Sequence, residues 1–143
     1  MNLLLIALTF LAADLPDKKL TPGATLNVTL QALCEKGYAG NVRNVPDSEK
    51  NKVYAEYGIK THTAGEYEVD HLISLELGGS NDIKNLWPQS YTGTWNAHVK
   101  DKLEDHLHVL VCAGTMKLED VQKKISTDWI TLYKNVFNTT KPK

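Results

Sequence analysis

The residues best suited to chemistry lie in one short stretch, residues 69–87, which reads VDHLISLELGGSNDIKNLW. An Asp-His pair at Asp70 and His71 comes first, and it is followed by Gly-Gly at 78–79 and Asn-Leu at 85–86. A histidine titrates near neutral pH, so His71 could act as a general base that takes a proton from water. The carboxylate of Asp70 is a hard oxygen ligand that suits Mg²⁺ or Mn²⁺.

The Asp-His pair is a weak signal by itself, because adjacent side chains of a strand point to opposite faces. Both residues could serve one site only if the backbone bends between them. In its context, however, the stretch resembles the signature of HNH (ββα-metal) nucleases. That signature has an Asp-His or His-His pair, a Gly-Gly turn, an Asn-Leu dipeptide and a third His or Asn on the following helix. The resemblance covers residues 66 to roughly 104, and this stretch is similar to small secreted bacterial HNH proteins. Ser74 stands where the family commonly has a proline.

The resemblance implies a role for each matched residue. His71 would be the general base, and Asp70 would hold one divalent cation, with Mg²⁺ preferred over Mn²⁺ or Zn²⁺. Asn85 would hold the loop and the backbone of the histidine in place. The expected reaction is hydrolysis of phosphodiester bonds of DNA, or of RNA as a second choice, leaving 5′-phosphate ends.

The third ligand has two candidates, Asn96 and His98, at the start of a helix predicted for residues 95–112. On a helical projection the apolar residues Val99, Leu103 and Leu107 cluster around Asn96, whereas His98 falls on the opposite side. This arrangement favours Asn96 as the second metal ligand and keeps His98 as the alternative.

The net charge of −1 argues against tight binding through phosphate neutralisation alone. Contacts with nucleic acid must come from a local patch or a metal, and we expect low sequence specificity. Lys100 and Arg43 are the candidates for phosphate contact. For Lys100, a surface lysine whose stem lies along the helix is the more frequent role.

Residues 1–13 resemble a signal peptide, with an apolar run that ends in small residues and cleavage expected near Ala13. The usual basic residues before the run are missing, and a buried N-terminal helix or strand is the alternative. Cys34 and Cys112 are the two cysteines, so one intramolecular disulfide is expected in an oxidising compartment, or else two separate buried thiols. Together these features predict a secreted or periplasmic protein with no membrane association after cleavage.

The patterning predicts an α+β fold: a ββα-metal (His-Me finger) hairpin and helix, with an N-terminal extension and a C-terminal packing helix. Residues 14–65 form the extension and residues 66–143 the HNH domain. Within them we expect a strand or extended arm at 24–33, a helix at 48–57 and a strand or hairpin arm at 67–77. A loop, or a loop with a further strand, is expected at 80–93, and an amphipathic helix at 118–137.

Two other functions are alternatives to the nuclease. A secreted module could keep the ββα scaffold only to bind nucleic acid or protein, but the Asp, the His and the Asn of the signature are all present. Hydrolases of other classes lack support, because the chain has neither a G-x-S-x-G nor an H-E-x-x-H motif.

Overall fold

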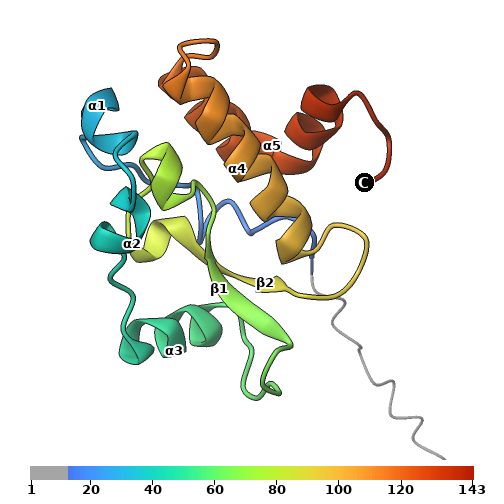
Figure 1. Ribbon diagram of the computed structural model, residues 1–143. Helices are drawn as coiled ribbons and strands as arrows, with labels where there is room; N and C mark the ends of the chain where they lie inside the picture. Colours follow the sequence, from blue (N-terminus) through green and yellow to red (C-terminus); the bar gives the residue numbers. More distant parts are fainter. Residues whose placement is uncertain (1–12) are drawn as a thin grey trace, which may run out of the picture.

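The computed structural model describes residues 13–143 and shows an α+β fold (Figure 1). Residues 1–12, which carry nearly all of the predicted signal peptide, lie outside the described residues. None of the helices within residues 13–143 is long and apolar enough to cross a lipid bilayer.

A two-stranded antiparallel hairpin lies at the centre of the molecule, formed by β1 (Tyr67–His71) and β2 (Leu86–Ser90). In its register Glu68 lies opposite Gln89 and Asp70 lies opposite Trp87. Directly opposed residues of an antiparallel pair share a face, and successive residues alternate between faces. Glu68, Asp70, Trp87 and Gln89 therefore share one face, and His71 belongs to the other.

The segment between the strands is more regular than the sequence predicted. β1 ends at His71 rather than at residue 77, and two short 3₁₀ helices follow, η1 (Leu75–Leu77) and η2 (Ile83–Asn85). Gly78 has a positive φ of 76°, and a Cβ on Gly79 would lie 1.7 Å from the carbonyl oxygen of Ile73. Only glycine fits at both positions, which explains the Gly-Gly pair of the motif.

Two long helices supply most of the core, α4 (Ala97–Cys112) and α5 (Leu118–Phe137). Their predicted bounds are confirmed, apart from the first two residues of the 95–112 range. α5 is interrupted at Asp128, whose backbone is extended and whose side chain accepts a hydrogen bond from the Thr131 N–H. Their buried contact residues are Leu103, Leu107, Val111, Val121, Ile125 and Trp129.

The N-terminal part contains three helices: α1 (Leu30–Leu33), α2 (Tyr38–Val42) and α3 (Asp47–Glu56). The helix expected at 48–57 is confirmed within one residue. The strand expected at 24–33 is wrong for its second half, because Thr29 caps α1 by accepting a hydrogen bond from the Ala32 N–H. In its first half only Thr25 forms a bridge, with Gly79.

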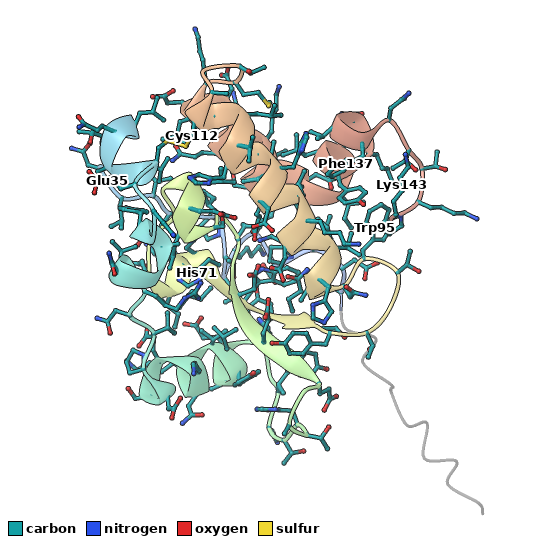
Figure 2. The ribbon with its side chains drawn as sticks, viewed as in Figure 1. Glu35, His71, Trp95, Cys112, Phe137 and Lys143 are labelled. Atoms are coloured by element: carbon teal, nitrogen blue, oxygen red, sulfur yellow. A yellow bond between two sulfur atoms is a disulfide. The ribbon has the colours of Figure 1, made fainter. Side chains whose placement is uncertain are left out.

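The predicted disulfide between Cys34 and Cys112 is confirmed, with the two Cα atoms 5.8 Å apart. It joins Cys34, the residue after α1, to Cys112, the last residue of α4, which is labelled in Figure 2. The bridge spans 78 positions of sequence and therefore attaches the N-terminal extension to the helical core.

We expect the variant Cys34→Ser/Cys112→Ser to fold with a free energy of unfolding lowered by about 2–4 kcal/mol, because the open chain gains entropy when it unfolds. Urea denaturation followed by circular dichroism measures the difference. The wild-type protein denatured under a reducing agent should lose a similar amount. A variant as stable as the oxidised protein would contradict the structural role of the bridge.

Candidate functional site at the hairpin and helix α4

Asp70 lies on the hairpin face that packs against α4. One of its carboxylate oxygens, Oδ2, accepts a hydrogen bond from Trp87 Nε1 at 3.2 Å and from Lys100 Nζ at 2.8 Å. The side chain of Asp70 keeps 11% exposure, so part of the carboxylate still reaches the surface. The Asp70 carboxylate thus binds α4 through Oδ2, one of its two oxygens.

Lys100 is completely buried, which corrects the expectation of a surface lysine. Its ammonium donates to Asp70 Oδ2, to the carbonyl oxygen of His71 at 2.8 Å, and to Glu104 Oε1. An ammonium has three protons to donate, and all three are used here. Lys100 therefore has no donor left for a phosphate, and the phosphate contact considered from the sequence does not fit.

The ammonium is surrounded by more negative than positive groups. Burial by itself lowers the pKa of Lys100, but the carboxylates of Asp70 and Glu104 outweigh it and hold the pKa above its ordinary value. Burial and the neighbouring charge of Asp70 raise the pKa of Glu68 and of Asp101. Burial also raises the pKa of Glu104. One lysine thus neutralises only part of a group of four carboxyl groups.

A buried glutamine lies on the same face with nothing bound to it. Gln89 is 2% exposed, and neither its amide oxygen nor its amide nitrogen has a hydrogen-bond partner among residues 13–143. An unpaired buried amide costs free energy, so a partner is expected. Gln89 lies directly opposite Glu68 and next to the Asp70 pair of the hairpin. The carboxylate and amide oxygens on this face are of the type that a hard divalent cation prefers.

His71 points to the other face of the hairpin, towards α2 (Figure 2). Its side chain is buried, and Nε2 lies 3.0 Å from Oδ1 of Asn81. Burial lowers the pKa of His71, against the smaller opposing effects of Asn81 and Asp70. The imidazole is therefore neutral at pH 7, which is the protonation state that a general base requires. The side chains of Asp70 and His71 leave opposite faces of β1, so the bend that would bring both into one site is not present in the strand. Lys100 connects the two residues by binding the Asp70 carboxylate and the backbone carbonyl oxygen of His71.

Asn85 is fully buried and holds the loop that follows His71. Its side chain accepts from the Ile73 N–H at 3.0 Å and donates to the carbonyl oxygens of Ile73 and Ser80 at 2.9 and 2.8 Å. The Leu72 N–H in turn donates to the Asn85 carbonyl at 2.8 Å. These contacts bring Asn85 together with the backbone next to His71, where the sequence predicted it to act.

The two candidates for the third ligand occupy different environments. Asn96 precedes α4 as its N-cap: its Oδ1 accepts from the Val99 N–H at 3.2 Å, and its Nδ2 donates to the Gly93 carbonyl at 2.9 Å. Both polar atoms are thus used to start the helix. His98 is exposed, as the helical projection predicted, and its ring lies 5.3 Å from that of Tyr91.

Arg43 and a cluster of two cysteines and a histidine lie outside the group around Lys100. Arg43 is exposed and follows Val42, whose carbonyl accepts from the same Asn81 side chain that contacts the His71 ring, so it lies on the histidine side of the hairpin. Among residues 13–143, one cluster has the composition of a metal site, formed by Cys34, His108 and Cys112. Because its cysteines form the disulfide, their sulfurs are not available as thiolate ligands.

Sequence reasoning missed Glu68, Asn81, Gln89 and Glu104 as members of the site. For Glu104 the signal was present, since it follows Lys100 by four positions and such pairs face each other on a helix. Glu68 and Gln89 could be found only from the strand register, which places them opposite each other. Asn81 had no signal in the sequence beyond its place in a turn.

Comparison of the chain with protein-family models, with curated proteins and with solved structures finds no match. The fold class therefore rests on the structure itself, which is an α+β arrangement with a two-stranded antiparallel hairpin.

We expect Lys100→Met to lower the free energy of unfolding by about 3–5 kcal/mol, because it leaves the buried carboxylates of Asp70 and Glu104 without their cation. Chemical denaturation at neutral pH measures the loss. Lys84→Met, the same change at an exposed lysine, is the matched control and should change stability by less than about 0.5 kcal/mol. Equal stability of the two variants would show that the buried ion group does not hold α4 on the hairpin.

Proposed function

We propose that the protein is a metal-dependent endonuclease of the HNH (ββα-metal) type, acting on phosphodiester bonds of DNA, or of RNA as a second choice, outside the cytoplasm. The observation that carries the proposal is the environment of His71. This histidine is buried, has a lowered pKa and ends the first strand of a hairpin, directly after a carboxylate bound to the facing helix.

The order of elements supports this proposal. β1, β2 and α4 follow one another in the chain as strand, strand and helix, and Lys100 of α4 connects to both residues of the Asp-His pair. Asn85 holds the loop between the strands as the signature requires. The motif residues thus surround the end of a single hairpin strand.

In the proposed reaction, the neutral imidazole of His71 takes a proton from a water molecule as the water oxygen attacks the phosphorus. The bond from phosphorus to the 3′ oxygen breaks, and that oxygen leaves with a proton from solvent, giving a 5′-phosphate and a 3′-hydroxyl. A bound divalent cation would neutralise part of the negative charge that builds on the phosphate and on the leaving oxygen. Asp70, with Glu68 beside it, would hold that cation.

Substrate binding would depend on few positive charges. Arg43 is exposed on the His71 side and is our candidate for a phosphate contact. A chain with a net charge of −1 gains little from phosphate neutralisation, so we propose rapid turnover with low sequence specificity rather than stable complexes.

We expect the oxidised protein to nick plasmid DNA and to cleave single-stranded DNA with Mg²⁺ or Mn²⁺, and to lose the activity in EDTA. His71→Ala should lower the rate by roughly 10²–10⁴-fold, which is the contribution of a positioned general base. His62→Ala, at an exposed histidine, is the matched control and should cleave like the wild type.

Three outcomes would count against this assignment. Cleavage that survives in His71→Ala would remove His71 as the base. Activity that persists in EDTA would remove the cation. A folded protein that cleaves neither DNA nor RNA with Mg²⁺, Mn²⁺ or Zn²⁺ would favour the alternative, a binding module on the same scaffold.

A further inference from the structure

The imidazole of His71 has two nitrogens in different surroundings. Nε2 lies 3.0 Å from Oδ1 of Asn81. Nδ1 makes no hydrogen bond within residues 13–143. The side-chain polar atoms there that lack a partner and are completely enclosed are Ser74 Oγ and both amide atoms of Gln89, so Nδ1 is not completely enclosed. Nδ1 is therefore the nitrogen that retains access to a small molecule such as water.

The orientation of the Asn81 amide is set by two backbone contacts. Its Nδ2 donates to the carbonyl oxygen of Val42 at 2.8 Å, and its Oδ1 accepts from the N–H of Asn44 at 3.2 Å. A carbonyl can only accept and an N–H can only donate, so both contacts require the same orientation of the amide. Oδ1 must therefore face His71.

This orientation decides which nitrogen of His71 carries the proton. Oδ1 is an acceptor, so Nε2 must be the donor and must hold the hydrogen. In a neutral imidazole the other nitrogen then bears the lone pair. We propose that Asn81 is a positioning residue that keeps the proton of His71 on Nε2 and leaves Nδ1 as the atom that takes the proton from water. The catalytic part of this inference rests on the proposed nuclease function.

An uncharged hydrogen-bond partner such as the Asn81 amide is suited to holding the tautomer of a general base. A carboxylate beside Nε2 would stabilise the charged imidazolium, and the base would then be protonated over more of the neutral range. An amide oxygen fixes the same tautomer without adding a charge. Asn81 thus does for the ring what a third group does for the base in other catalytic arrangements, which is to orient it.

The backbone contacts of Asn81 also fix the chain on both sides of Arg43. Val42 and Asn44, the two residues bound by Asn81, flank Arg43 in the chain. Their backbone is fixed at the end of α2, next to the ring of His71. The Asn81 contacts therefore set the base and the backbone at Arg43 relative to each other.

The first test reads the tautomer directly and needs no enzymatic activity. Long-range ¹H–¹⁵N spectra of the ¹⁵N-labelled protein at neutral pH distinguish a protonated from an unprotonated ring nitrogen. We expect the wild-type His71 to show a protonated Nε2 and an unprotonated Nδ1. A wild-type spectrum with the proton on Nδ1 would overturn the inference, whether or not any variant folds.

The second test removes the acceptor. Asn81→Leu should give His71 signals of mixed tautomers and lower kcat roughly 10–100-fold, the usual size of losing an orienting partner, while KM changes less than about twofold. Asn51→Leu, the same change on the exposed side of α3, is the matched control. Asn81→Asp keeps an oxygen acceptor and should restore the Nε2–H tautomer in spectra recorded at alkaline pH, where the ring is neutral.

The two tests separate the failure of this inference from the failure of the proposed function. If no nucleic acid is cleaved, the nuclease proposal falls, and the tautomer spectra alone decide the role of Asn81. If the wild type cleaves DNA and Asn81→Leu, folded by its amide spectrum, keeps the wild-type kcat, then Asn81 does not position the base. An equal loss in Asn51→Leu would also overturn its specific role.

Discussion

The burial of the Lys100 ammonium is the constraint on which the arrangement of the hairpin and α4 depends. A charged group loses a large hydration free energy when it leaves water, and only close partners can offset the loss. Lys100 has three, namely the carboxylates of Asp70 and Glu104 and the carbonyl of His71. The first and third belong to β1, so the helix cannot move along the hairpin without leaving charges unpaired in the interior.

The alternation of a strand then separates two kinds of chemistry across one backbone. Asp70 and Glu68 face α4, where negative charge accumulates and an unpaired Gln89 is buried. His71 faces α2, where its ring partner is a neutral amide and where burial lowers its pKa. A carboxylate and an imidazole adjacent in sequence thus reach different environments, and burial keeps the imidazole neutral, as its proposed role as a base requires.

The sequence predicted the parts of this fold that local patterns control. The apolar periodicity of residues 118–137 and the glycines after α3 and α4 gave the bounds of long helices almost to the residue. The strand after residue 85 and the short helix at residues 30–33 were harder, because tertiary pairing and a single cap decide them. Lys100 was expected at the surface, because a charged side chain on a helix is usually exposed. Its burial follows from partners on another element, which no local pattern shows.

His71 is held at three levels, and each level uses a different residue. Lys100 binds its carbonyl oxygen, Asn85 binds the backbone of the loop that follows it, and Asn81 binds its ring. A base held only at the backbone could rotate about its side-chain bonds, and a base held only at the ring could shift with its strand. Fixing both confines the reactive nitrogen to a small volume, which is what a positioned base needs to be effective. The two asparagines therefore have separate tasks, and only Asn85, which binds backbone, belongs to the signature of the sequence. Asn81 acts on the side chain, where the choice between two ring nitrogens is made.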